Sequence, residues 1–132
     1  LAHACERAAA QGLTILIEPI NQRDAPGYHL SHIEQAAETI AAIGAPNLKI
    51  LFDCYHVQIM QGDLSRRFEA HRGLIGHVQI AAVPDRGEPD QGEVDLAWLL
   101  PRLGHPGPIG AEYRPRSSTE HGLGWLNQFQ AL

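Results

Sequence analysis

Basic side chains and long apolar runs are both scarce in this chain. Its 132 residues hold 10 lysines and arginines against 15 aspartates and glutamates, for a net charge of −5. Because no basic stretch exists to neutralise phosphates, the composition argues against a nucleic-acid partner. No apolar run approaches the roughly 18 residues that cross a bilayer, so we expect no membrane partner either.

Cysteine is also rare. Cys5 and Cys54 are the only two, and neither has the close partner of a CxxC motif, so the sequence predicts no disulfide framework. A reduced, cytoplasmic setting is the default expectation for such a chain. A hydrophobic share of 44% and a charged share of 19% are typical of a globular protein, and the length predicts a single domain over residues 1–132.

Four short apolar runs, each ending in an oxygen-bearing side chain, are the most informative feature that is present. Their final residues are Glu18, Asp53, Gln79 and Glu112, at intervals of 35, 26 and 33 residues. Short runs rich in Ile, Leu and Val are typical of buried parallel strands, and this spacing is close to one βα unit per step. We therefore predict strands at 13–18, 48–53, 74–80 and 108–112.

Helices are expected between these strands. The clearest one starts near Ser31, where Ser31 and Glu34 form a predicted capping box, and ends at Gly44. The other expected helical segments are a first helix capped by Gly12, helical turns from the second strand to about residue 71, and helices near 95–103 and 119–131.

The predicted order, one helix followed by four βα units, is half of a β/α barrel. An eight-stranded barrel needs about 250 residues, and the opening segment reads as the end of a helix that begins earlier. Four parallel strands alone would leave two strand edges unpaired and the inner face of the sheet open to solvent. The chain is therefore expected to be the C-terminal half of a larger barrel, or to pair with a second copy, or to pack in another way.

The carboxyl ends of barrel strands form the active face of that fold, so the four final residues should converge there. Carboxylate and amide oxygens are ligands of hard divalent ions, and the sequence predicts a metal site made by Glu18, Asp53, Gln79 and Glu112. An aspartate at a strand end is often only a helix N-cap, and Gln79 alone indicates little. The four together, in register with the strand repeat, favour the metal site.

Two histidines accompany these residues. His56 lies three residues beyond Asp53, on the first helical turn, and so can face the same site at the carboxyl ends of the strands. His77 precedes Gln79 by two residues and shares its face of the strand, either as a substrate contact or as a core histidine.

Two polar loops complete the predicted mouth. After Gln79 the chain is crowded with Pro, Gly and acidic residues, and we expect a solvated loop in which Glu88 is one surface group and Glu93 is the best functional candidate. After Glu18, the loop that carries Asp24 could fold over the strand ends.

Four segments closely resemble the C-terminal half of the hydroxypyruvate isomerase family: IEPINQRDAPGYHL, NLKILFDCYHVQIMQGDL, GHVQIAAVPDRGEPDQGEVD and GAEYRPRSSTEHGLGWL. That family lies within the xylose isomerase-like TIM barrels, beside the 2-oxo-tetronate isomerases. The resemblance covers nearly all of residues 13–126 in the correct order, and it implies the C-terminal half of a xylose isomerase-like (β/α)8 barrel. Two departures are Ala111, where cysteine is common, and Leu96, where an aromatic residue is common.

The resemblance also implies a site. In that family Mg²⁺ or Mn²⁺ binds two glutamates, one aspartate and one further ligand, which here are Glu18, Glu112, Asp53 and Gln79. The two glutamates also give and take the proton, so Glu18 and Glu112 are the implied catalytic pair.

These residue types suit the isomerisation of a short hydroxy or oxo acid. Moving a carbonyl between adjacent carbons needs two carboxylates that remove and return a proton, and a divalent ion that stabilises the enediolate. Arg86 suits a substrate carboxylate and His56 a substrate hydroxyl. The predicted enzyme is a metal-dependent aldose–ketose isomerase acting on hydroxypyruvate, giving tartronate semialdehyde, or on 2-oxo-tetronate.

Other readings of the same residues stay open. A sugar 3-epimerase or an endonuclease-like hydrolase of the same superfamily would keep the fold and the metal. A catalytically inactive half-barrel is the non-enzymatic alternative, and a homo-oligomer or the missing N-terminal half is the expected partner.

Overall fold

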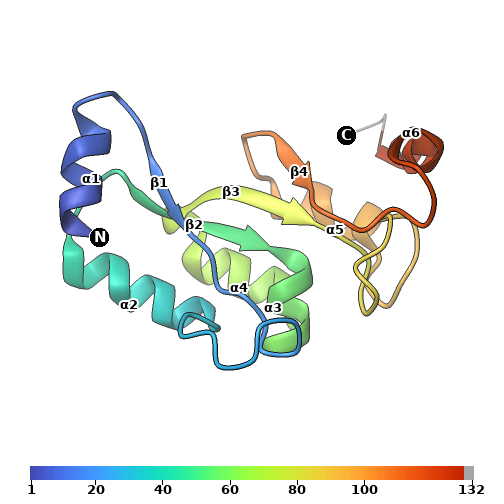
Figure 1. Cartoon of the computed structure of the whole chain (residues 1–132), viewed down its shortest axis with the longest axis horizontal. Coiled ribbons are helices and arrows are strands. Elements are labelled where there is room, and N and C mark those ends of the chain that lie inside the picture. The colour runs from blue at the N-terminus through green and yellow to red at the C-terminus, as the bar shows by residue number, and fades with distance from the viewer. Residues whose placement is uncertain (130–132) are drawn as a thin grey trace.

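A four-stranded parallel sheet, with the strand order β1-β2-β3-β4, is the centre of the computed structural model, which describes residues 1–129 (Figure 1). The strands are β1 (Ile15–Ile17), β2 (Leu48–Asp53), β3 (Ile75–Ile80) and β4 (Ile109–Ala111). All four predicted strands are confirmed, although β1 and β4 are shorter than expected. Each strand pairs with the next one along the chain, as successive βα units do.

The helices follow the predicted alternation. They are α1 (Ala2–Ala9), α2 (Ile33–Ile43), α3 (Cys54–Met60), α4 (Leu64–His71), α5 (Leu96–Leu103) and α6 (Thr119–Gly122), with short 3-10 helices η1 (Arg72–Leu74) and η2 (Leu123–Phe129). Figure 1 shows α2, α3 and α4 along one side of the sheet. The last predicted helix is thus a single α turn followed by 3-10 turns, and its final residues 130 and 131 lie outside the described residues. No helix in the described part of the chain is both long and apolar enough to span a bilayer.

The start of α2 differs from the prediction. Its capping box uses Gln35, not Glu34: the Gln35 carboxamide oxygen accepts the backbone N–H groups of Ser31 and His32, both at 3.0 Å. The helical turns expected after β2 are the two helices α3 and α4, which are separated by Gly62 and Asp63 with left-handed φ angles of 65° and 51°.

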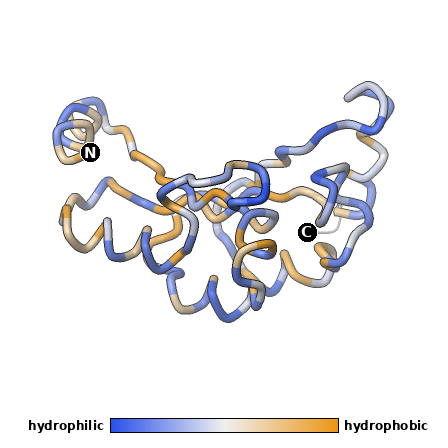
Figure 2. Tube along the Cα trace, turned by 60° about the horizontal axis from the view of Figure 1, so that its bottom comes forward, coloured by the Kyte–Doolittle hydropathy of each residue, from blue (hydrophilic) through white to orange (hydrophobic). Residues whose placement is uncertain are grey.

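The hydrophobic core lies between the sheet and the helices on one face. Alternate residues of β2, namely Leu48, Ile50 and Phe52, are buried on that face, and Phe52 meets Phe68 of α4 edge to face with ring centroids 5.4 Å apart. Figure 2 shows that hydrophobic residues gather along the strands and recur at intervals along the helices. The opposite face of the sheet is more open, since Leu16 on β1 is 38% exposed there.

A bulge at Gly76 sets which residues of β3 face the open side. Ile50 pairs with Ile75, but Leu51 pairs with His77, so Gly76 is an extra residue in β3. A Cβ at Gly76 would lie 2.8 Å from the Cβ of Lys49, and therefore only glycine fits. Beyond the bulge the register brings Gln79 beside Asp53.

Candidate metal centre

Glu18, Asp53 and His56 come together where β1 and β2 end. One ligand atom from each residue lies within 4.8 Å of the others. The His56 Nε2 atom is 3.6 Å from Glu18 Oε1 and 3.7 Å from Asp53 Oδ2. Asp53 is the last residue of β2 and His56 lies on the first turn of α3, so the strand-to-helix junction places both side chains. The structure therefore brings together two of the four predicted ligands, Glu18 and Asp53, with His56 beside them.

Asp53 caps a helix and also keeps one buried oxygen free of hydrogen bonds. Its Oδ1 accepts the Tyr55 N–H at 2.8 Å and so caps α3. Its Oδ2 is buried and has no hydrogen-bond partner among the described residues. One oxygen thus stabilises the helix while the other remains available to a ligand.

Gln79 and Glu112 extend this edge of the sheet across β3 and β4. Gln79 pairs in register with Asp53 on one side and with Gly110 on the other. Glu112 follows β4, and its backbone N–H donates to the Ile80 carbonyl at 3.1 Å, which continues the strand pairing by one residue. The four predicted ligands therefore occupy four successive strand ends.

Unpartnered buried oxygens test whether these residues fit a cation. Within the described residues, Glu18 Oε1, Asp53 Oδ2 and Gln79 Oε1 are all buried without a hydrogen-bond partner. Buried polar atoms are rarely left in this state, because each loses its hydration without compensation. Three acceptor oxygens from neighbouring strands fit a positively charged ligand, and hard divalent ions take such oxygens.

Burial is the main cause of the shifted pKa values at the site. Burial, followed by the nearby charges of Asp53 and Glu112, raises the pKa of Glu18 to about 7. Burial also raises the pKa of Asp53 to about 6. Burial, followed by the positive charge of Arg86, lowers the pKa of His56 to about 4, so this imidazole is neutral at pH 7. A bound cation would relieve the repulsion between the carboxylates.

Arg86 and Glu112 form the other side of the site. The Arg86 Nη2 atom lies 3.1 Å from Glu112 Oε2, and the guanidinium carbon lies 5.1 Å from the centre of the Tyr55 ring. Arg86 adopts a left-handed φ of 57°, and its carbonyl accepts the Arg114 N–H at 2.7 Å. The loop after β3 is therefore tied to the segment after β4, which places Arg86 at the mouth.

His77 lies apart from this cluster. It sits on β3 opposite Leu51, and its Nε2 would be 3.0 Å from a Cβ at Gly110, so the glycine in β4 leaves room for the ring. His77 is not in the group formed by Glu18, Asp53 and His56. Its role as a substrate contact stays a prediction.

A buried network behind His56 was missed from the sequence. Asn21 is 0% exposed and contacts the His56 ring, and the Tyr55 hydroxyl donates to Asp24 Oδ2 at 2.8 Å. The loop after β1 therefore does fold over the strand ends, as expected for Asp24. No local pattern marks Asn21, because an asparagine in a Pro- and Gly-rich loop is usually a turn residue.

Glu88 corrects the prediction of a wholly solvated loop after β3. It is only 3% exposed, its Oε2 lies 3.0 Å from Arg116 Nε, and its Oε1 accepts the Arg116 backbone N–H at 2.9 Å. Arg116 also pairs with Asp90. Glu93, the candidate preferred from the sequence, is exposed instead. Glu88 thus fastens the Arg86 loop to the segment after β4.

We expect Glu88→Gln to destabilise the protein by about 1–2 kcal/mol, because the ion pair between the buried Glu88 carboxylate and the half-exposed Arg116 guanidinium is lost. Urea unfolding followed by circular dichroism measures the change. Glu93→Gln is the matched control in the same loop, with an expected change within about 0.5 kcal/mol. Equal effects of the two substitutions would contradict the role assigned to Glu88.

Comparison with known proteins identifies the relatives of this chain. The family described as xylose isomerase-like TIM barrel matches residues 1–129. A 2-oxo-tetronate isomerase of Cupriavidus necator is 50% identical over 132 residues, which cover 98% of this chain and 51% of that protein. The hydroxypyruvate isomerase of Escherichia coli is 39% identical over 133 residues, covering 98% and 52%.

Solved structures agree. A crystal structure described as an AP endonuclease of family 2, from Brucella melitensis, is 42% identical with a TM-score of 0.92, and the match covers 97% of this chain and 51% of that one. A 3-keto-D-glucoside 4-epimerase from Escherichia coli is 25% identical with a TM-score of 0.82, covering 95% and 49%. The chain spans about half the length of the curated relatives it matches. The chain has four parallel strands, and the model of the xylose isomerase-like TIM barrel family matches residues 1–129. The chain therefore belongs to that family.

Proposed function

We propose that the protein is a metal-dependent isomerase of a short 2-oxo or hydroxy acid, with hydroxypyruvate or 2-oxo-tetronate as substrate. The observation that carries the proposal is the set of buried, unpartnered oxygens of Glu18, Asp53 and Gln79 at adjacent strand ends. Relatives named 2-oxo-tetronate isomerase and hydroxypyruvate isomerase, at 50% and 39% identity, support the same reaction class.

Glu18, Asp53, Gln79 and Glu112 would hold the ion. A donor set of oxygens alone suits Mg²⁺ or Mn²⁺ better than Zn²⁺, which prefers nitrogen and sulfur. When bound, the ion would supply Lewis-acid stabilisation of the negative charge that develops on the substrate oxygens.

The protein's own groups would carry the proton. Isomerisation removes a proton from the carbon next to the carbonyl and returns one to the neighbouring carbon, with no net gain or loss. A carboxyl group such as that of Glu18 can take the proton in one step and give it back in the other. Glu112 is its proposed counterpart across the site.

Arg86 supports an acidic substrate. Its guanidinium is the cation that faces the cluster, and it already pairs with a carboxylate, that of Glu112. A substrate carboxylate would bind the same planar fork of donors. This placement favours a 2-oxo acid over a neutral sugar.

A sugar epimerase is the second candidate. The similarity to a 3-keto-D-glucoside 4-epimerase at 25% identity favours it, and epimerisation also removes and returns a proton beside a carbonyl. The two functions differ in whether the substrate needs a carboxylate, and therefore in their dependence on Arg86.

A side-by-side assay tests the proposal. With Mg²⁺ or Mn²⁺ present, we expect turnover of hydroxypyruvate or 2-oxo-tetronate and little turnover of the neutral ketose D-allulose. Arg86→Met should raise the KM for the acid by about 30-fold or more, since a desolvated charge pair is lost. Arg102→Met, an exposed arginine on α5, is the control and should leave KM unchanged. Preferential turnover of the neutral ketose would favour the epimerase instead.

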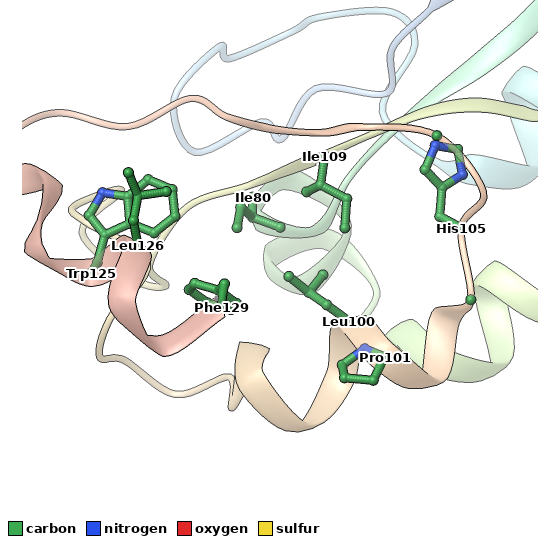
Figure 3. A pocket seen from close by; sticks show the side chains of 10 residues that line it. Ile80, Leu100, Pro101, His105, Ile109, Trp125, Leu126 and Phe129 are labelled. Atoms are coloured by element: carbon green, nitrogen blue, oxygen red, sulfur yellow. The ribbon is translucent and has the colours of Figure 1, made fainter. Parts of the chain in front are cut away.

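A further proposal concerns the partner that completes the fold. The outer edges of β1 and β4 have no neighbouring strand in the described part of the chain. A hydrophobic cavity of about 570 Å³ opens beside β4, and Figure 3 shows Ile80, Ile109, Leu100, Trp125 and Phe129 around it. Unpaired strand edges and apolar hollows are usually covered by protein. A second copy of this chain, or the further half of the length that the relatives have, would cover them.

In isolation, the 132-residue chain is expected to form a dimer or a larger assembly. Paired edges would bury the open faces of two sheets, as in a closed barrel. Sedimentation velocity at micromolar concentration measures the mass. A folded, stable monomer under these conditions would rule out closure by self-association.

A further inference from the structure

We propose that Asn21 holds His56 in the neutral tautomer with its proton on Nε2, so that His56 is a hydrogen-bond donor to the substrate and not a metal ligand. Proximity alone would group His56 with Glu18 and Asp53 as a three-ligand metal site. The hydrogen bonds behind the ring lead to a different assignment. The inference rests on the proposed function only for the identity of the substrate and the ion that bind at this site.

The first argument is a backbone donor. The Asn21 backbone N lies 3.3 Å from His56 Nδ1, and the geometry is that of a hydrogen bond. A backbone N–H can only donate, so Nδ1 must offer a lone pair. A neutral imidazole whose Nδ1 accepts carries its proton on Nε2.

The second argument is the orientation of the Asn21 side chain. The Asp24 backbone N–H donates to one end of this carboxamide at 2.8 Å, so that end is the oxygen. The other end is therefore the NH2 group, and it lies 2.6 Å from His56 Nδ1 and 3.1 Å from Asp24 Oδ2. The same Asp24 oxygen accepts the Tyr55 hydroxyl at 2.8 Å, which holds the network in place. Asn21 is fully buried, so water does not compete for these bonds.

The edge of the His56 ring that carries Nε2 points toward Glu18 and Asp53. Nε2–H faces Glu18 Oε1 at 3.6 Å and Asp53 Oδ2 at 3.7 Å, beyond hydrogen-bond distance to either. A metal ligand needs a free lone pair, and here Nδ1 is occupied and Nε2 is protonated. The carboxylates of Glu18 and Asp53 would then hold the ion, while the Nε2–H group of His56 would donate to a substrate oxygen. Asn21 acts through His56 and is a positioning residue.

The tautomer can be observed directly. In the chain labelled with ¹⁵N-histidine, long-range proton–nitrogen correlation spectra distinguish protonated from unprotonated ring nitrogens, and His56→Gln identifies the His56 signals. We expect an unprotonated Nδ1 and a protonated Nε2 at neutral pH. A protonated Nδ1 would overturn the proposal. The spectrum needs neither substrate nor turnover, so its outcome is separate from that of the isomerase assay.

Substitution tests the role of Asn21. The backbone N–H of residue 21 remains in every variant, but its contact with His56 Nδ1 is 3.3 Å long, against 2.6 Å for the side-chain contact. The carboxylate in Asn21→Asp can only accept at the shorter contact, so the ring proton should move to Nδ1 and leave a lone pair on Nε2, with affinity for Zn²⁺ relative to Mg²⁺ rising about tenfold or more. Gln22→Glu adds the same charge at the neighbouring, exposed position and should leave the tautomer unchanged. If Asn21→Asp does not fold, Asn21→Ala should produce a detectable population with the proton on Nδ1. A folded Asn21 variant of either kind with the wild-type tautomer would show that the Asn21 side chain does not set the tautomer, and would contradict the proposal.

Discussion

Asp53→Asn is expected to weaken Mn²⁺ binding by at least about 100-fold while leaving the fold intact. Asparagine is as good a helix N-cap as aspartate, so the bond to the Tyr55 N–H can persist. What is lost is the charge and basicity of Oδ2, the buried oxygen that has no partner. Titration calorimetry with Mn²⁺ measures the affinity, and thermal unfolding checks the fold.

Asp63→Asn is the control for this titration, because it makes the same change of charge at an exposed residue that precedes α4. Equal Mn²⁺ affinities for Asp53→Asn and the unmodified chain would remove Asp53 from the metal site.

The metal titration should also depend on pH. Because the pKa of Glu18 is about 7 and that of Asp53 is about 6, an ion must displace protons from both carboxyls in mildly acidic solution. Affinity should therefore fall as the pH is lowered from about 8 to about 6, and the heats should vary with the ionisation enthalpy of the buffer.

Glu18→Gln is expected to slow the exchange of carbon-bound substrate protons with D₂O by about 10²–10⁴-fold, the usual contribution of a positioned general base. The same loss is expected for Glu112→Gln, since the proton must be both removed and returned. Proton NMR of the substrate in D₂O measures the exchange. Mn²⁺ affinity must be measured for the same variants, because each glutamate is also a proposed ligand.

Glu93→Gln is the matched control for these exchange measurements, with the same chemical change in an exposed side chain of the loop after β3. Isomerisation accompanied by normal exchange in a metal-loaded Glu18→Gln variant would exclude Glu18 as the base.

The strands and the convergence of their final residues could be predicted because both depend on local patterns. Short runs of β-branched and aliphatic residues favour buried parallel strands whatever the rest of the chain does. The carboxyl ends of such strands lie at one edge of the sheet, so Glu18, Asp53 and Gln79 had to come close once the strands paired. Gly44 ended α2 as predicted, because its φ of 68° is a conformation that favours glycine.

Contacts between distant segments had no such local signal. Glu88 was expected in solvent, and only the approach of Arg116, 28 residues later, made its burial possible. The capping box lies one residue later than predicted, with His32 as the N-cap and Gln35 three residues on, and Glu34 instead pairs with Arg67 of α4. The contacts of Glu88 with Arg116 and of Glu34 with Arg67 both join segments that are far apart in the sequence.

The sequence by itself therefore determined the strand order and the oxygen-bearing side chains at the strand ends, since backbone sterics and side-chain periodicity act over a few residues. The tertiary structure decided the register and the surroundings of the site. The extra residue Gly76 aligns Gln79 with Asp53, and the buried Asn21 sets the hydrogen bonding of His56, 35 residues away. Both depend on which segments meet in space, and the free energy of those contacts is not encoded in any single stretch of the chain.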